Sequence, residues 1–186
     1  MPDVPSLPGR AQCGQGRLGV SNASQGPVAS LSIAQTANIT TGATGPNGAT
    51  VSDTLPAVTD PGGTPSTSCA PAPGTVFAIG TTTVTCTATD TTDANSPLST
   101  TFTVTVMGAG GQLTSLGQAV QGVGVGLSAT VALVQQELAN SHPKLACATL
   151  VAFIAEVKLE TPRPIPAGIA TQLVADAKQI QSVLAC

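Results

Sequence analysis

The chain has 186 residues, of which 41% are hydrophobic and 8% charged, with a formal net charge of −3. It is long enough for one or two domains with a buried core. No Lys or Arg lies between Arg17 and Lys144, and Tyr and Trp are absent, which excludes the basic, aromatic surfaces that bind nucleic acids. With His142 as the single histidine and nine acidic residues, few catalytic arrangements can be assembled, so we expect neither an enzyme nor a cofactor.

Residues 1–30 are rich in Pro, Gly, Ser and Gln and show no hydrophobic period, which predicts a flexible leader. They lack the continuous apolar segment of a signal peptide. Three alternatives stay open: the native start lies upstream of Met1, export uses another route, or the chain is part of a longer protein. The run VASLSIAQTANIT at 28–40 has a β-type composition and could add a strand to another sheet.

From residue 31 to residue 107 apolar and polar residues alternate, and the turn sequences GPNG, DPGG and APAPG separate the runs. The clearest runs are TTTVTCTATD at 81–90 and TTFTVTV at 100–106; weaker ones lie at 37–43, 49–58 and 75–79. Alternation places the apolar set on one face of a sheet. Short strands at this spacing predict a small antiparallel β-sandwich.

The outward positions of the two clear runs are occupied by threonine. They are Thr83, Thr85, Thr87, Thr89, Thr101, Thr103 and Thr105. Together they would present an uncharged surface of methyl and hydroxyl groups, suited to another sheet, a glycan surface or ice. The alternative is that threonine is simply the common outward residue of an uncharged sandwich.

Residues 108–111 read as a Gly linker, and helical spacing of apolar residues follows it. The pattern predicts two short helices over 113–138 with a break near 122–126, one from Pro143 to Val157, and a last one from Ile169 to Leu184. Helices of this length are not stable alone, so we expect a small bundle. Glycines and glutamines interrupt the apolar run over 112–136, which argues against membrane insertion.

None of the five cysteines has the close spacing of a zinc site. We pair Cys69 with Cys86 and Cys147 with Cys186, closures that contribute about 3 and about 4 kcal/mol respectively in the loop-entropy model. Two disulfides indicate an oxidising, extracytoplasmic setting. Cys13 then pairs with another chain, pairs with an upstream segment, or stays free.

Two further groups of residues are candidate sites. Asp90, Asp93 and Asn95 could offer oxygen ligands to a surface calcium ion. Carboxylates in turns usually accept hydrogen bonds from their own backbone, so we expect no metal there. His142 precedes a proline at a helix boundary with no nucleophile motif nearby, and we expect it to face solvent.

The stretch APAPGTVFAIGTTTVTCTATD followed by TTFTVTV resembles the hyalin repeat (HYR) domain, and the likeness spans about 36–106. The matching residues are Cys69, Pro73, Gly74, Phe77, Ile79, Gly80, Thr82, Val84, Cys86, Ala88 and Asp90. The resemblance implies an immunoglobulin-like sandwich related to fibronectin type III, a link to adhesion, and no general catalytic site.

The segments CATLVAFIAEV and IPAGIATQLVADAKQIQSVLAC are similar to FIMAH, a helical module at the ends of bacterial extracellular proteins. This likeness spans about 112–186. It implies a bacterial protein that is secreted or attached to the cell surface.

The sequence therefore predicts a flexible leader over 1–30, a HYR-type sandwich over 31–107, a Gly linker over 108–111 and a FIMAH-like helical bundle over 112–186. The predicted function is a non-enzymatic adhesion or spacer module outside the cell or on its surface. Its expected partners are other surface proteins, glycans or copies of itself, and not nucleic acid. The alternative is a subunit of an extracellular fibre that assembles by exchange of its N-terminal β-strand.

Overall fold

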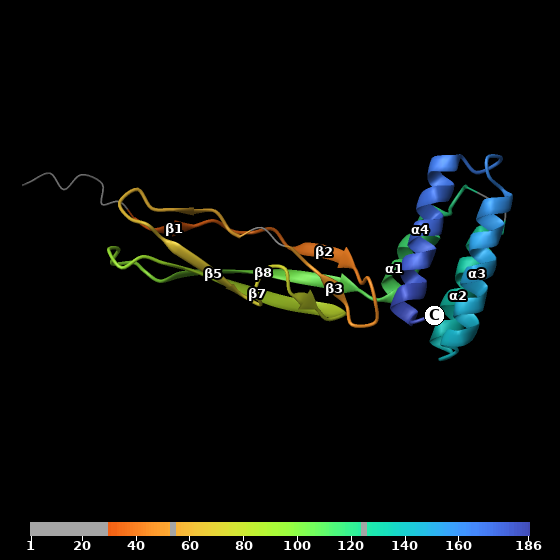
Figure 1. The fold of residues 1–186 in the computed structure, drawn as a ribbon, viewed down its shortest axis with the longest axis horizontal. Coiled ribbons are helices and arrows are strands. Elements are labelled where there is room, and N and C mark those ends of the chain that lie inside the picture. The colour runs from red at the N-terminus through yellow and green to blue at the C-terminus, as the bar shows by residue number, and fades with distance from the viewer. Residues whose placement is uncertain (1–29, 53–54, 124–125) are drawn as a thin grey trace, which may run out of the picture.

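The computed structural model describes residues 30–52, 55–123 and 126–186. A long β region over 30–107 ends against four helices that stand across its end (Figure 1). Cys13 and all but the last residue of the predicted leader lie outside the described residues.

The centre of the β region is a hairpin of two long antiparallel strands, β7 (Gly80–Thr89) and β8 (Leu98–Met107). On its flanks, β5 (Ser66–Ala70) pairs antiparallel with β7, and β2 (Ile39–Gly42) pairs parallel with β8. The order in this four-stranded sheet is β2-β8-β7-β5.

Four shorter strands form two antiparallel pairs. β1 (Ser32–Ile33) pairs with β4 (Val58–Thr59), and β3 (Ala49–Thr50) pairs with β6 (Val76–Phe77). The region is thus a mixed sheet with two small pairs, which is compatible with a sandwich.

The prediction of a wholly antiparallel arrangement is wrong for β2, because this strand runs parallel to β8. A parallel pair needs a long connection. Most of the β region lies between these two strands in the chain, so that condition is met. Alternation of apolar residues carries no information on strand direction.

The predicted alternation in β7 and β8 is confirmed by burial. Val84, Cys86 and Ala88 are buried on β7, and Phe102, Val104 and Val106 on β8, whereas their threonine neighbours are exposed or half-buried. The β core also takes in residues from the short strands and loops, which are Ala43, Ala49, Val51 and Phe77.

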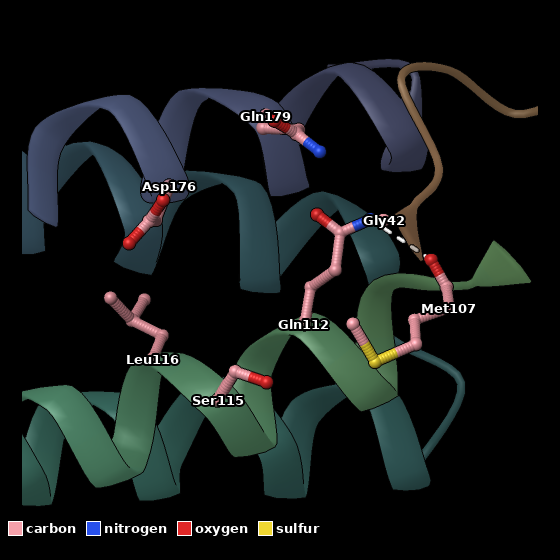
Figure 2. A pocket seen from close by; sticks show the side chains of 7 residues that line it. All are labelled: Gly42, Met107, Gln112, Ser115, Leu116, Asp176 and Gln179. Atoms are coloured by element: carbon pink, nitrogen blue, oxygen red, sulfur yellow. Dashed lines mark hydrogen bonds between the residues drawn. The ribbon is translucent and has the colours of Figure 1, made fainter. Parts of the chain in front are cut away.

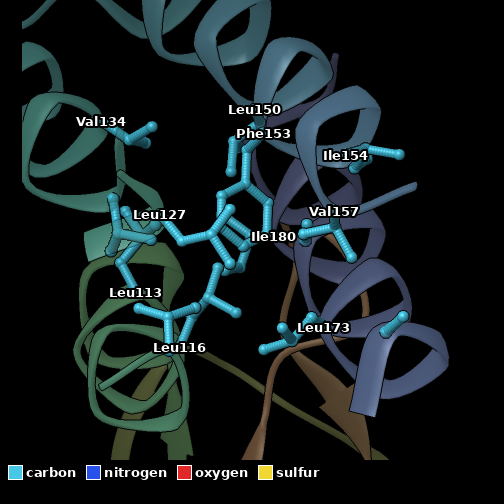
Figure 3. Close-up of a cluster of buried hydrophobic side chains, with 14 of the residues drawn as sticks. Leu113, Leu116, Leu127, Val134, Leu150, Phe153, Ile154, Val157, Leu173 and Ile180 are labelled. Atoms are coloured by element: carbon cyan, nitrogen blue, oxygen red, sulfur yellow. The ribbon is translucent and has the colours of Figure 1, made fainter. Parts of the chain in front are cut away.

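The helices are α1 (Ala109–Ala119), α2 (Leu127–Ala139), α3 (Pro143–Leu159) and α4 (Ala167–Leu184). Each buries one apolar stripe, as the sequence spacing predicts. Leu113 of α1, Leu127 of α2, Phe153 of α3 and Ile180 of α4 are fully buried and converge in one core (Figure 3). Within the described residues, no helix has the length and apolar character needed to span a bilayer.

The predicted four-residue linker shortens to Gly108 alone, because α1 begins at Ala109 and includes Gly110 and Gly111. The helix starts here because its first turn is anchored to the sheet. The Gln112 amide nitrogen Nε2 donates to the carbonyl oxygens of Ala43 at 2.9 Å and Met107 at 3.0 Å.

The last helix also reaches the β region. Val183 of α4 is buried within the β core, and Gln179 Nε2 donates to the Ala43 carbonyl oxygen at 3.1 Å. The end of the β region and the helices are therefore joined by both apolar and polar contacts.

Each region contains one disulfide, and the pairs are those expected from the sequence. Cys69–Cys86 joins residues that face each other across β5 and β7, with 17 residues of separation. Cys147–Cys186 ties the first turns of α3 to the second residue after α4, with a separation of 39.

Candidate functional site

The outer face of the four-stranded sheet carries the predicted threonines in register. Thr83 lies opposite Thr103, and Thr85 lies opposite Thr101. Thr83, Thr85, Thr89 and Thr101 are exposed, and Thr87, Thr103 and Thr105 are half-buried. The structure thus brings all seven to one face.

Strand pairing adds hydroxyl residues that the sequence pattern missed. Thr40 on β2 lies beside Thr105, Thr81 lies opposite Thr105, Ser99 opposite Thr87, and Ser66 and Ser68 extend the face onto β5. We call the resulting surface the threonine face. Its members are Thr40, Ser66, Ser68, Thr81, Thr83, Thr85, Thr87, Thr89, Ser99, Thr101, Thr103 and Thr105.

Hydrogen bonds between hydroxyl groups fix parts of this face. They join Thr81 to Thr105 at 3.1 Å, Thr87 to Ser99 at 3.0 Å and Ser66 to Thr89 at 2.8 Å. A hydroxyl has one donor and two acceptor positions. Each linked pair therefore keeps lone pairs, and one proton, for an outside partner.

The threonine face contains no charged, aromatic or nucleophile-activating side chain. It cannot move protons at neutral pH, since catalysis of that kind needs a group with a matched pKa. What it offers is regularly spaced hydroxyl groups for hydrogen bonding and methyl groups for burial. This chemistry suits binding.

Acidic side chains gather at the end of the sheet away from the helices, where β7 turns into β8. Asp90 is 8% exposed and accepts hydrogen bonds from the backbone amides of Thr64 at 2.9 Å and Thr92 at 2.6 Å. Asp93 accepts from the Leu31 amide at 2.9 Å. Asp60, which the sequence analysis had not linked to them, lies close enough to affect both.

These surroundings shift two carboxyl groups in opposite directions. Hydrogen bonds from the hydroxyl and the backbone amide of Thr92 hold the pKa of Asp90 below its ordinary value. Desolvation, followed by the negative charge of Asp60, raises the pKa of Asp93. Proton uptake at Asp93 therefore removes a desolvated charge and, secondarily, its repulsion by Asp60.

Asn95 uses its amide for the fold, donating to Ser30 Oγ at 3.0 Å and to the Leu31 carbonyl oxygen at 2.9 Å. In the part of the chain that the structure describes, no group of three or more His, Cys, Asp or Glu side chains is placed to hold a metal ion. His142 is exposed at the start of α3. The structure therefore places neither Asn95 in a metal site nor His142 in a catalytic one.

A small cavity lies where the sheet meets the helices (Figure 2). Its volume is about 190 Å³, and its lining includes Met107, Gln112, Ser115, Leu116, Asp176 and Gln179. The sequence could not reveal it, because α1, α4 and the end of β8 meet there only through tertiary packing.

Residues 29–106 match the family model of the HYR domain. The comparisons with curated proteins and with solved structures found no match. HYR domains are non-enzymatic extracellular modules associated with cell adhesion. The HYR part of the resemblance is therefore confirmed, and the likeness of 112–186 to FIMAH stays a prediction.

Proposed function

We propose, starting from the HYR match over 29–106, that this chain is a non-enzymatic adhesion and spacer module outside the cell or on its surface. It would bind a surface glycan or a surface protein through the threonine face. The single observation that carries this proposal is an uncharged hydroxyl face that continues across all four strands of the main sheet.

The lack of charge on the threonine face limits the classes of partner that it can bind. Because no member is charged, the face gives no electrostatic attraction to nucleic acid or to other highly charged polymers. A neutral glycan matches it, since its hydroxyl groups can donate to and accept from threonine and serine. At one end of the face a hollow of about 450 Å³ includes Ser66, Thr89 and Asp90 in its lining, within the size range of ligand pockets.

The spacer role is supported by the length of the β region and by the disulfide that cross-links it. Each region is cross-linked internally by a disulfide, which fits an oxidising environment. On this proposal the β region is an immunoglobulin-like sandwich and the four helices are a FIMAH-like bundle. The setting would then be a bacterial cell surface or its surroundings.

The test is a binding screen of the whole chain against neutral and charged glycans and matrix proteins, followed by substitution on the face. Thr83→Lys combined with Thr101→Lys places two ammonium groups, whose charge is costly to desolvate, at two exposed positions in the centre of the face. We expect binding to at least one neutral glycan or surface protein, and a loss of at least tenfold in the variant. Stability should change by less than about 0.5 kcal/mol, because both sites are on the surface.

Ser52→Lys combined with Ala57→Lys is the matched control, since both residues are exposed in the β region but lie off the face. It adds the same charge and should leave binding unchanged. Equal binding by the face variant and the wild type would contradict the proposal, as would equal losses in both variants.

The fibre alternative is favoured by one observation, which is that β7 is the only neighbour of β5 among the strands that the structure describes. Its outer edge offers unpaired backbone groups to a strand from another copy. Against this, residues 31–42 are already used within the chain: Leu31 is buried, β1 pairs with β4, and β2 pairs with β8. Size-exclusion chromatography with electron microscopy separates the readings, and stable monomers would count against the fibre.

A further inference from the structure

We propose that the cavity between the sheet end and the helices binds a primary ammonium group on an aliphatic stem, such as a lysine side chain or a small alkylamine. This site is separate from the threonine face and does not depend on the function proposed for it. The inference follows from which hydrogen-bonding groups at the cavity are already used and which stay free.

The orientation of the Gln112 amide is fixed by its partners. Nε2 donates to the carbonyl oxygens of Ala43 and Met107, and carbonyl oxygens accept but never donate. Both N–H groups are thus consumed, and Oε1 must lie on the opposite side of the amide. Figure 2 shows this oxygen on the side away from Gly42, in the space between α1 and α4. Gln112 therefore offers the cavity an acceptor only.

Ser115 and Asp176 have the same character. The Ser115 hydroxyl donates to the Gly111 carbonyl oxygen at 3.3 Å, which leaves its lone pairs free. Asp176 accepts from Gln172 Nε2 at 2.7 Å through Oδ1, which leaves Oδ2 free. Gln112, Ser115 and Asp176 thus offer three acceptors to one small space, one of them on a charged carboxylate. Gln179 also lines it, donates one Nε2 N–H to the Ala43 carbonyl oxygen, and keeps its second N–H and its Oε1.

The charge of the cavity selects the ligand class. Among the residues that the structure describes, Asp176 is the only ionisable group in its lining, and no cationic side chain lines it. An ammonium group has three donors and no acceptor, so it matches acceptors from Gln112, Ser115 and Asp176. A neutral alcohol of the same shape has one donor and no charge, and should bind far more weakly.

Size and apolar lining favour a narrow aliphatic stem. The cavity volume of about 190 Å³ is smaller than that of pockets for drug-sized molecules. Leu116 is 1% exposed, and the Met107 side chain completes an apolar wall. Methylene groups of a lysine-type chain can pack against such a wall while the charged end reaches the acceptors.

Binding here would also connect the two regions. Ser115 lies on α1, Asp176 on α4, and Met107 ends β8. A ligand that touches all three binds only the folded arrangement of these elements, so saturating amine should raise the melting temperature of the whole chain.

The experiment is an NMR titration of the full chain that follows the side-chain amide signals of Gln112 and Gln179. The probes are n-butylamine, n-butanol as its neutral counterpart, and an N-acetylated, C-amidated Gly-Lys-Gly peptide. We expect saturable shifts with butylamine and no saturation with butanol. Shifts with the peptide as well assign the site to a lysine side chain of a partner, whereas shifts with butylamine alone assign it to a free amine.

Asp176→Asn tests the charge, and Glu160→Gln is the control because it removes one acid of the helical region that does not line the cavity. Butylamine affinity should fall at least tenfold in the first variant and stay unchanged in the second. The proposal is overturned if neither amine shifts the glutamine signals, if butanol binds as well as butylamine, or if Asp176→Asn binds like the wild type.

Discussion

The β region and the helical region are each closed by one disulfide, but the two bonds restrain different things. Cys69–Cys86 connects residues that strand pairing already holds opposite each other. Cys147–Cys186 connects the start of α3 to Cys186, just beyond α4, and helices, unlike paired strands, form their backbone hydrogen bonds within themselves. A disulfide between paired strands thus reinforces contacts that the sheet already makes. A disulfide between helices adds a restraint that side-chain packing would otherwise have to provide alone.

The largest effect should come from the helical core, because its cohesion is mostly apolar packing. Phe153 is fully buried there, and Phe153→Ala should lower the free energy of unfolding of this region by about 3–5 kcal/mol. Urea unfolding followed by the helical circular dichroism signal measures it. Val151→Ala, on the exposed side of α3, is the control and should change stability by less than about 0.5 kcal/mol.

The disulfides should follow, with the longer loop giving the larger effect. Replacing Cys147 and Cys186 by Ala should remove about 4 kcal/mol, and replacing Cys69 and Cys86 by Ala about 3 kcal/mol. Urea unfolding of the two double variants, with helix and sheet signals followed separately, tests the order. A greater loss in the β-region variant would show that the bond among the helices is redundant with packing.

The contact between the regions should have an intermediate effect. Gln112→Leu leaves the carbonyl oxygens of Ala43 and Met107 without this donor, which should cost about 1–3 kcal/mol. Amide hydrogen exchange at the end of β8 and the first turn of α1 should then accelerate. Gln118→Leu changes an exposed glutamine of the same helix and should leave exchange there as it is.

The smallest effect is a pH dependence of the β region. An aspartate has an ordinary pKa of about 3.9. Because the pKa of Asp93 is raised in the folded state, proton uptake there favours folding, and stability should rise as the pH falls from neutral through that raised pKa. The lowered pKa of Asp90 acts oppositely: its contribution is present above about pH 3.9 and is lost as the pH falls through the lowered pKa.

Urea midpoints of the β region at a series of pH values measure this profile. Asp93→Asn should remove the rise on mild acidification, and Asp90→Asn should remove the fall at lower pH. A profile that stays flat in the wild type would contradict both assignments.

The sequence predicted best where a single periodic pattern ran long enough to exclude other structures. β7, β8 and the four helices lie where alternation or helical spacing placed them. β5 was missed because Ser66–Ala70 is nearly all polar, with only the half-buried Thr67 and Cys69 facing the core. The start of α1 was missed because glycines weaken helices in general, and the contact of Gln112 with the sheet is invisible in the sequence.

The candidate sites also differ in whether a local sequence pattern is enough to predict them. The seven threonines share a face because residues two apart in a strand always do, so local sequence sufficed. Asp60 joins Asp90 and Asp93 from a distant turn, and Gln112 and Asp176 line one cavity from two different helices. Such groupings depend on tertiary packing, which residue spacing does not encode.

In the described part of the chain, charge is distributed unevenly between the two ends of the molecule. Among the described residues of the β region, the charged side chains are Asp60, Asp90 and Asp93, all at the end remote from α1. The helical end balances its acids with Lys144, Lys158, Arg163 and Lys178. The described part of the molecule is thus negative at one tip and balanced at the other, an asymmetry on which the field of a charged surface would exert a torque.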